Sequence, residues 1–298
     1  MDFQIRRTTI KPGFLNWGQE FLNLPELWRR SRGEGMTVGI VDSGIAISHP
    51  DLKHAVIDSR DFAGSTTGVG DETGHGTHVA GIVAAKDDGQ GVVGIAPSAK
   101  LLNAKVVLRP GVEIAEAVVA QAIDWVVATG AGVVCLSIAW PKPVSLIEAA
   151  IDRATAQGRI VVCAAGNRGP LGGPVGYPAR YANALAVGYV TRDSEGRPRG
   201  TRDSAAGPEV DIVAPGGDVL STFPPNIYAE ASGTSFAAPF VAGVLALLGA
   251  RLLKEGKPPL DVAGVEARLK RRALKAGGRG RSDAAGWGLI DPAALLSE

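Results

Sequence analysis

Short, continuous runs of apolar residues alternate along this chain with segments of helical periodicity. The runs have the length of single strands and occupy residues 36–41, 101–107, 133–137, 160–164, 185–190 and 210–213. They lack the every-second-residue polarity of a strand with one wet face, which indicates burial on both faces. Because such strands belong to parallel sheets covered by helices, the sequence predicts an α/β fold, a doubly wound, mainly parallel sheet flanked by helices.

Helix signals fill the intervals between these runs. Residues 113–129 carry apolar side chains at helical spacing. Ser145 and Glu148 match the capping-box pattern at the start of a second helix. Asp261 is suited to cap a later helix that continues through Arg272. We therefore expect helices on both faces of the predicted sheet.

Bulk properties exclude several classes of function. The 298 residues carry a net charge of +1, so no global basic field favours nucleic acid or an anionic membrane as a partner. No apolar run is expected to reach the roughly 18 residues of a membrane span. The charged start, residues 1–7, is not that of a signal peptide, which favours a cytoplasmic location unless the chain is a trimmed secreted enzyme. Cys135 and Cys163 lie in apolar runs, and we expect them to be free, buried thiols.

Three stretches surround one functional side chain each with glycine or other small residues. They are residues 38–44 with Asp42, 74–81 with His75, and 232–239 with Ser235. An acid, a base and a nucleophile in this order along a chain are one of the known arrangements of a serine hydrolase triad. Alone, Ser235 would be better explained as the N-cap of the long apolar helix that follows, with Pro239 in its first turn.

The stretch Ala164-Ala165-Gly166-Asn167 adds a side-chain amide after the predicted strand 160–164. Asp42 and Asn167 both fall at the carboxyl ends of predicted strands, where ligands bind in doubly wound sheets. An amide at that edge could stabilise an oxyanion, although a single Asn there is also typical of a turn.

From about residue 17 to residue 296, these four motifs resemble the catalytic domain of a subtilisin-like serine protease, a subtilase. The resemblance implies a three-layer fold and a serine endopeptidase that acts through a seryl acyl-enzyme. It assigns catalysis to Asp42, His75 and Ser235, and the oxyanion site to Asn167 with the Ser235 amide. His78, one turn after His75, is expected to be structural; a zinc site at this pair lacks a third ligand at the required spacing.

The resemblance also implies a structural calcium ion. The family's site joins an aspartate shortly after the catalytic one to a loop after the histidine helix. Here the matching side chains are those of Asp51 and Asp88, and the matching carbonyls those of Lys86, Gln90 and Val92. Oxygen donors of this kind suit calcium. Solvated acidic turns are the alternative explanation.

Substrate preference is where the chain departs from the family pattern. The resemblance assigns the substrate-binding residues to Ser137, Ile138, Ala139, Trp140, Gly166 and Arg168. Ala139 and Trp140 stand where extracellular subtilisins have two glycines, which should narrow or reshape the pocket or change its backbone. Arg168 could favour an acidic substrate residue, or simply face solvent.

Two other functions remain compatible with these motifs: a peptide ligase or macrocyclase that uses the same acyl-enzyme, and a non-catalytic peptide-binding pseudoprotease. The expected domains are an N-terminal extension, residues 1–16, and a peptidase domain, residues 17–298. The extension has about the length of the segment that covers the cleft in intracellular subtilisins, so the chain could belong to that type. A peptide or protein is the expected partner.

Overall fold

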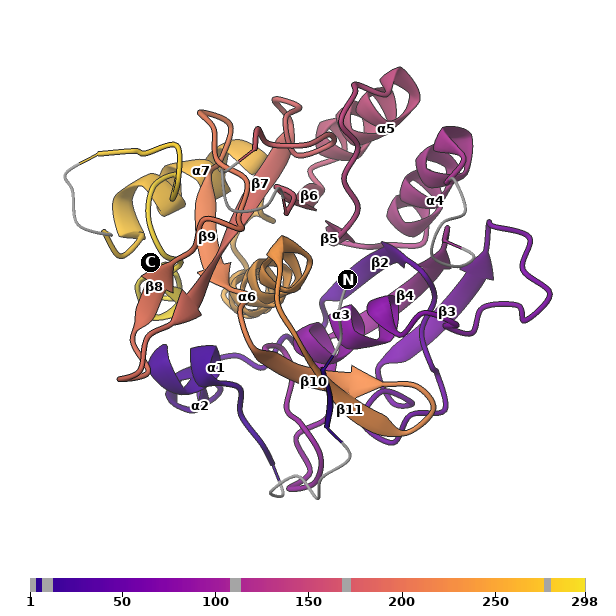
Figure 1. The fold of residues 1–298 in the computed structure, drawn as a ribbon, viewed down its shortest axis with the longest axis horizontal. Coiled ribbons are helices and arrows are strands. Elements are labelled where there is room, and N and C mark those ends of the chain that lie inside the picture. The colour runs from indigo at the N-terminus through magenta and orange to yellow at the C-terminus, as the bar shows by residue number, and fades with distance from the viewer. Residues whose placement is uncertain (1–3, 7–12, 108–113, 168–172, 276–279, 298) are drawn as a thin grey trace.

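The computed structural model describes residues 4–6, 13–107, 114–167, 173–275 and 280–297. Its central element is an eight-stranded sheet in the order β3-β4-β2-β5-β6-β7-β8, with β9 paired to β7 (Figure 1). All pairs are parallel except β7 with β8. The strands are β2 (Thr37–Asp42), β3 (Val56–Asp61), β4 (Lys100–Lys105), β5 (Val133–Leu136), β6 (Ile160–Ala164), β7 (Ala184–Arg192), β8 (Pro198–Gly200) and β9 (Ile212–Pro215). The predicted mainly parallel α/β fold is confirmed.

Helices cover both faces of this sheet. On one face α3 (His75–Ala84) packs beside α6 (Thr234–Lys254), which contacts β5, β6, β7 and β9. On the other face α4 (Glu116–Ala128) and α5 (Ser145–Ala156) pack together over β2, β4, β5 and β6 (Figure 1). Shorter helices lie around the rest of the sheet, namely α1 (Trp17–Phe21), α2 (Leu24–Leu27), α7 (Val262–Arg272) and α8 (Pro292–Leu295). The apolar strands are therefore buried on both sides, as their composition predicts.

Helix α6 corrects one expectation from the sequence. It is 21 residues long and apolar enough to cross a membrane by length and composition. Its apolar window is 89% buried inside the protein, because strands and α3 surround it. A helix that is hydrophobic all round is as typical of a protein core as of a membrane span. Here α6 is the central core helix.

A second, antiparallel sheet packs against α3. It has the order β1-β11-β10, formed by β1 (Gln4–Arg6), β10 (Val219–Phe223) and β11 (Ile227–Ala231). The buried His78 holds this sheet to α3, since its Nε2 donates to the carbonyls of Val219 and Ala229 at 3.1 and 3.0 Å. Burial lowers the pKa of His78 to about 3, so the ring is neutral at physiological pH. The structural role expected for His78 is confirmed.

Details at helix ends differ from the sequence predictions. Helix α5 has Val144 as its N-cap without a side-chain cap bond, so the capping box predicted from Ser145 and Glu148 is wrong. The prediction at α7 is confirmed, because the Asp261 side chain accepts a hydrogen bond from the Gly264 amide at 2.6 Å. Both cysteines are free and buried, as expected. Strands β3, β10 and β11 lack a continuous apolar run, so the apolar pattern predicts no strand at these positions.

Candidate active site

Asp42 and His75 come from different elements and meet in a short hydrogen bond. Asp42 is the last residue of β2, and His75 is the first residue of α3. The His75 Nδ1–H donates to Asp42 Oδ1 at 2.6 Å, and the Asp42 carboxyl group is almost fully buried. The same Oδ1 also accepts from the Ser43 amide at 2.7 Å. These bonds fix the orientation and the tautomer of the imidazole, leaving Nε2 as the nitrogen available for chemistry.

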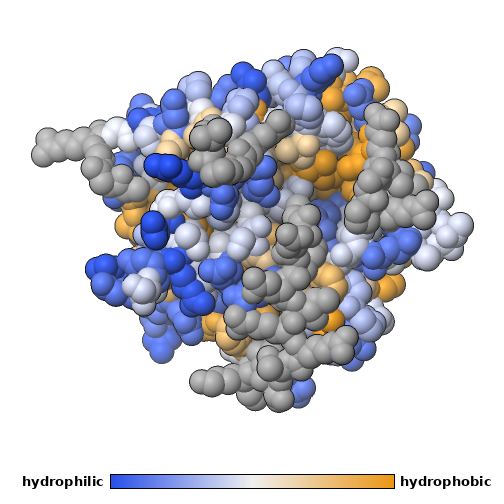
Figure 2. All heavy atoms as spheres, viewed as in Figure 1, coloured by the Kyte–Doolittle hydropathy of each residue, from blue (hydrophilic) through white to orange (hydrophobic). Residues whose placement is uncertain are grey.

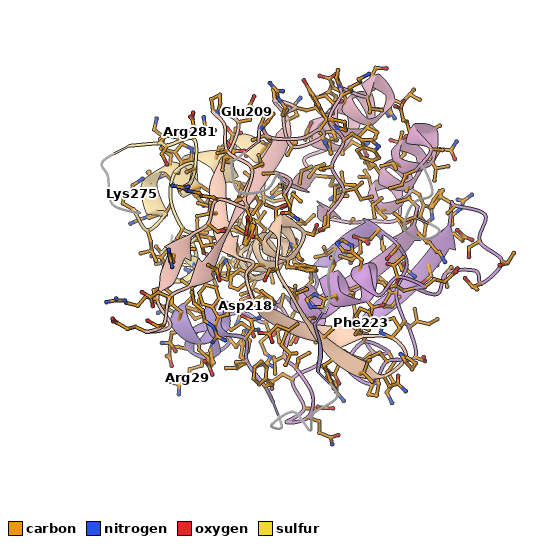
Figure 3. All side chains as sticks on the ribbon, in the orientation of Figure 1. Arg29, Glu209, Asp218, Phe223, Lys275 and Arg281 are labelled. Carbon is orange, nitrogen blue, oxygen red and sulfur yellow. The ribbon has the colours of Figure 1, made fainter. Side chains whose placement is uncertain are left out.

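Two glycines beside His75 permit this approach. Gly74 is the N-cap of α3 and has a φ of +84°, and a Cβ there would lie 2.1 Å from the ring of Phe223, which Figure 3 labels at the end of β10. A Cβ on Gly76 would lie 2.2 Å from the Gly44 carbonyl oxygen and 3.2 Å from Asp42. A side chain at Gly76 would push the helix away from β2, and one at Gly74 would collide with Phe223 of β10, which explains the Gly-His-Gly motif.

Asp71 ties the two catalytic elements together, and the sequence analysis missed it. Its Oδ1 accepts from Ser43 Oγ and from the amides of Thr73 and Gly74, each at 2.9 Å. Its Oδ2 accepts from the Thr77 amide at 2.9 Å and the Thr77 hydroxyl at 2.6 Å. One carboxylate thus satisfies free donors at the start of α3 and binds the residue after Asp42. The available signal was an Asp just before a helix start, a favoured capping position.

A buried lysine holds the loop that carries Asp71. Lys105 is the last residue of β4 and is paired with Asp42 in the sheet. Its ammonium group is fully buried and donates to Gly70 O at 2.6 Å, with Ser65 Oγ at 3.1 Å and Glu72 Oε1 at 3.3 Å. A buried ammonium group is tolerated only when oxygens replace its water shell. The loop between β3 and α3 supplies those oxygens.

The charge environment favours protonation of His75. Burial of the imidazole disfavours its cation, but the charge of Asp42 and its hydrogen bond outweigh that effect, with a smaller contribution from Asp71. The pKa of His75 is therefore raised above 6.5. A carboxylate that stabilises the imidazolium is what a general base requires when it takes a proton during the reaction.

Ser235 lies in the first turn of α6, but it is not the N-cap. Gly233 holds that position, so the explanation of Ser235 as a capping residue is wrong. Pro239 lies beyond the first turn, which corrects its predicted place, and it has no N–H for the Ser235 carbonyl. Ser137 Oγ donates to that carbonyl at 2.9 Å instead. In return, Ser235 Oγ donates to the Ser137 carbonyl at 3.3 Å.

The hydrogen bond between His75 and Ser235 is not formed in this structure. Among the described residues, the buried His75 Nε2 has no hydrogen-bond partner, and the Ser235 hydroxyl is turned to Ser137. The His75 ring nevertheless lies 5.6 Å from the ring of Phe236, the residue after Ser235. Side-chain rotation at Ser235 moves the hydroxyl between staggered positions. Catalytic hydrogen bonds of this kind are often long or misaligned before substrate binds.

Asn167 follows β6 and is held by the start of α6. Its Oδ1 accepts from the Thr234 amide at 2.9 Å and from the Thr234 hydroxyl at 3.0 Å. The side chain is exposed, and a Cβ on Gly233 would lie 2.7 Å from Asn167 Nδ2. Because Oδ1 is engaged, the amide group of Asn167 is oriented with its Nδ2 hydrogens available as donors.

Comparison with known proteins decides the family. Residues 33–288 match the subtilase family. The chain belongs to the subtilase family. It is 39% identical over 248 residues to subtilisin DY of Bacillus licheniformis, covering 83% of this chain and 86% of that one. It is 36% identical over 265 residues to the major intracellular serine protease of Bacillus subtilis strain 168, covering 86% and 82%. This subtilase is a serine endopeptidase and acts on peptide or protein substrates.

The predicted substrate-binding residues of this subtilase lie on two segments beside Ser235. Residues 137–140 continue β5, and Gly166 continues β6. Figure 2 shows hydrophobic surface gathered where Figure 1 places α4 and the segment that leads from β5 to α5. Arg168 and the edge segment near residue 110 lie outside the described residues.

The predicted calcium side chains lie near each other at the end of α3. Asp51 is buried, and its Oδ2 accepts from the Val92 amide at 3.0 Å and the Tyr228 hydroxyl at 3.1 Å. Burial raises the pKa of Asp51, although hydrogen bonds partly offset the effect, and the charge of Asp88 raises it further. Asp88 Oδ2 lies 3.2 Å from Lys86 Nζ. The negative charges of Asp51 and Asp88 therefore act on each other, and a cation bound between them would stabilise both carboxylates.

The loop carbonyls fit the same interpretation. The carbonyls of Lys86, Gln90 and Val92 accept no hydrogen bond from another described residue, whereas those of Ala85 and Gly91 do. The loop that contacts Asp51 therefore has three backbone oxygens that accept no hydrogen bond from the described residues. In the described part of the chain, no group of three or more His, Cys, Asp or Glu side chains gathers, so a cation here would depend on carbonyl oxygens.

Proposed function

We propose that this subtilase cleaves peptide bonds with Ser235 as nucleophile, His75 as general base and Asp42 as the group that orients and stabilises the imidazolium. The observation that carries the proposal is the pair at 2.6 Å between His75 Nδ1 and Asp42 Oδ1. It leaves the buried Nε2, beside the first turn of α6, without a partner among the residues that the structure describes. A buried ring nitrogen without a hydrogen-bond partner destabilises the folded protein, and a hydrogen bond from a nucleophile or a substrate removes that cost.

The chemistry proceeds by acyl transfer in two halves. His75 Nε2 takes the proton of Ser235 as its oxygen attacks the substrate carbonyl, and returns that proton to the leaving amine. A water molecule then loses a proton to Nε2 and attacks the acyl-enzyme, and Ser235 recovers its hydrogen when the acid leaves. Each half leaves the imidazole neutral, so the enzyme is regenerated.

Asn167 and the Ser235 amide are proposed to bind the oxyanion. The Ser235 amide belongs to the first turn of α6, where amides have no intrahelical acceptor. The Asn167 side chain is held by Thr234, directly before Ser235. Two donors from fixed positions, one at a helix amino terminus, match the charge that develops on the attacked oxygen.

The test is covalent labelling with a serine-directed fluorophosphonate, followed by peptide mapping. We expect a single adduct on Ser235, loss of peptidase activity in step with labelling, and no labelling of the Ser235→Ala variant. The His75→Ala variant should label far more slowly, because the hydroxyl loses its base. An active protein that is labelled elsewhere, or not at all, would refute the assignment of Ser235. Product masses separate hydrolysis, which adds water, from the unfavoured ligase alternative.

We also propose that the loop of residues 86–92 and Asp51 hold a structural calcium ion. The supporting observations are the buried Asp51 carboxylate and the three loop carbonyls that lack a described donor. When bound, the ion would supply positive charge to two carboxylates and would link the loop to the segment after β2. Its role in this proposal is stability, not a step in catalysis.

Removal of calcium should therefore lower the melting temperature. An ion present at about 100 times its Kd stabilises the fold by about 2.7 kcal/mol. We expect a chelator to produce this loss in the wild type and not in Asp51→Asn, which would already melt at the lower temperature. Asp58→Asn removes an exposed carboxylate of β3 and serves as the matched control. An unchanged wild-type melting temperature would remove calcium from the proposal.

The N-terminal extension is proposed to regulate access to this site. β1 runs antiparallel to β11, with Gln4 opposite Glu230, so its amino end lies beside the end of β11 that leads into α6. A strand added to a sheet edge is held by main-chain hydrogen bonds. Deleting residues 1–6 should raise kcat/KM for short peptides without loss of melting temperature. An unchanged kcat/KM would exclude the regulatory role.

A further inference from the structure

Positive charge is concentrated in one short part of this chain, residues 268–281. This segment has seven lysine and arginine side chains and no aspartate or glutamate. Because the whole chain has 31 basic and 30 acidic side chains, the remaining residues carry six more acidic than basic groups. The net charge of +1 therefore conceals a separation of charge, and such an asymmetry is typical of a protein that binds a charged polymer or surface.

Three of these cations converge on one indole ring, that of Trp287. The centroid of the ring lies 5.3 Å from Lys270 Nζ, 5.8 Å from Lys275 Nζ and 5.4 Å from the guanidinium carbon of Arg281. Lys275 Nζ also donates to the carbonyls of Lys270 at 3.3 Å and Trp287 at 3.2 Å. We call these four residues the Trp287 cluster, and Figure 3 labels two of them, Lys275 and Arg281, at the left of the view. Cation–π attraction holds the three positive groups within about 12 Å of one another.

Little negative charge balances the Trp287 cluster. Among the described residues, Asp211 is the only one with a carboxylate within 4.0 Å of these cations, and it pairs with Arg281 at 2.9 Å. Asp211 is buried, whereas all three cationic side chains are exposed. Like charges held this close repel one another, and a bound anion would relieve that repulsion. The cluster is therefore suited to bind negative charge from outside the protein.

The donors of the Trp287 cluster suit phosphate. A guanidinium group presents donors that match two phosphate oxygens, and an ammonium group binds phosphate as a point charge. A chain of phosphates, unlike a single anion, can contact all three cations at once. An anionic membrane fits less well, because membrane binding also increases with buried apolar area. In the described part of residues 268–289, the only large apolar side chain that is exposed is that of Leu274, at 40%.

The Trp287 cluster lies away from the catalytic side chains. Arg281 donates to Val210 O at 3.0 Å and to Asp211, the two residues that precede β9, so it lies at the amino end of that strand. Strand β9 is parallel to β7 and, through β6 and β5, to β2. Asp42 is at the carboxyl end of β2. A polymer bound at the cluster would therefore leave the candidate active site open to substrate.

We propose that the Trp287 cluster is a binding site for a polyanion with repeating phosphate groups. Inorganic polyphosphate and the backbone of a single-stranded nucleic acid both present this chemistry. The site recognises the charge and spacing of the phosphates, and no base contact is required. It attaches the peptidase to the polymer without taking part in peptide cleavage, so it is independent of the roles proposed for Asp42, His75 and Ser235.

The test measures binding of a fluorescein-labelled single-stranded oligonucleotide by anisotropy, with inorganic polyphosphate as competitor. The Ser235→Ala protein is used so that the sample does not digest itself. Three phosphate contacts should give a slope of about −2 for log affinity against log salt concentration. Polyphosphate should displace the oligonucleotide, and the ratio of their affinities identifies the preferred source of the phosphate chain. Absence of binding, or an oligonucleotide that polyphosphate does not displace, would overturn the proposal.

Charge variants locate the site. Lys270→Gln with Lys275→Gln should weaken binding at low salt by at least about tenfold and make the salt slope shallower by about 1.4. Lys270→Arg with Lys275→Arg keeps both charges and should bind like wild type, which separates charge from a structural effect. Lys53→Gln with Lys254→Gln removes the same charge from exposed positions elsewhere and is the matched control. An equal loss in the control would assign binding to the overall field of the protein and refute the site.

The fluorescence of Trp287 provides a local measurement. An anion that binds the cations on the ring should change this emission when polyphosphate is added. The change should be absent in Trp287→Phe, which keeps an aromatic ring for the cations. A change that persists in this variant would place the polymer elsewhere and refute the proposal.

Three further measurements test the chemistry and the position of the site. Binding to phosphatidylserine vesicles but not to polyphosphate, or equally tight binding of polyglutamate, would overturn the assignment to a phosphate chain. Polyphosphate should leave kcat/KM of the wild type on a short neutral peptide unchanged. Inhibition would place the polymer in the active site and refute a separate binding site, whereas loss of all peptidase activity without polyphosphate would refute only the proposed function.

Discussion

The site has two halves that are held in place by different kinds of contact. The acid–base half contains Asp42 and His75, and the acyl half contains Ser235 and the backbone segments beside it. Asp42 and His75 are fixed by side-chain hydrogen bonds that converge on Asp71, with Lys105 beneath the loop. Around Ser235 the boundaries are mostly backbone, and the space between them is set by glycines and one methyl group. The first half therefore tolerates little change. The second can alter substrate preference without disturbing proton transfer.

The largest effect is expected from the acyl half at the nucleophile itself. In subtilisin, loss of the catalytic serine costs about 2 × 10⁶ in kcat, and we carry that magnitude to Ser235→Ala. Steady-state hydrolysis of an Ala peptide measures it. The melting temperature is the control, since the variant loses only one weak bond to Ser137. Residual activity within a hundredfold of wild type would contradict the role of Ser235.

The oxyanion donor should be the next most sensitive position. For Asn167→Ala we expect kcat to fall by about 10²–10³, or about 2.7–4 kcal/mol, the magnitude known from subtilisin, with KM little changed. The comparison variant is Thr234→Val, which removes one of the two bonds that orient Asn167 and should lose much less. Equal losses in kcat and in binding would indicate a structural role for Asn167 instead.

Asp71 tests whether the acid–base half acts as one unit. Asp71→Asn keeps the shape of the side chain but replaces one acceptor oxygen with a donor facing groups that themselves donate, and should lower kcat about tenfold. The raised pKa of His75 means that kcat/KM increases as pH rises above 6.5, because the base must be neutral. Loss of the Asp71 charge should move this acid limb to lower pH. A pH profile identical to wild type would confine Asp71 to folding.

The smallest effect on rate is expected at Lys105, whose side chain supports the loop but bonds to neither Asp42 nor His75. Lys105→Met removes a buried donor from several oxygens and should destabilise the fold by about 1–3 kcal/mol, with only a few-fold loss of kcat. Chemical denaturation measures the difference. Glu72→Gln should leave stability close to wild type, because Glu72 is exposed and glutamine keeps a side-chain oxygen that can accept from Lys105. A large loss of kcat without destabilisation would assign Lys105 a direct role.

The sequence predicted much of this arrangement because the signals are local. Continuous apolar runs identified the buried parallel strands, and glycine-rich stretches identified Asp42, His75 and Ser235 before their positions in space were known. The predictions that failed concern helix ends and the apolar length of α6. The capping box at Ser145 is absent, and Pro239 lies past the first turn, since neighbouring elements decide where a helix begins. Asp71 and Lys105 were not predicted, because the contact of Asp71 with Ser43 and those of Lys105 with the loop at residues 65–72 join residues distant in sequence.

The amino-acid sequence by itself determined the order of the elements and the burial of the sheet and indicated the candidate reactive groups, since these follow from periodicity and residue chemistry. Only the tertiary structure decided that Ser137 satisfies the carbonyl freed by Pro239, and that the Ala139 methyl lies between Gly166 and Gly176. Those contacts join segments tens of residues apart. Their distances are set by the packing of strands and helices, which no local pattern encodes.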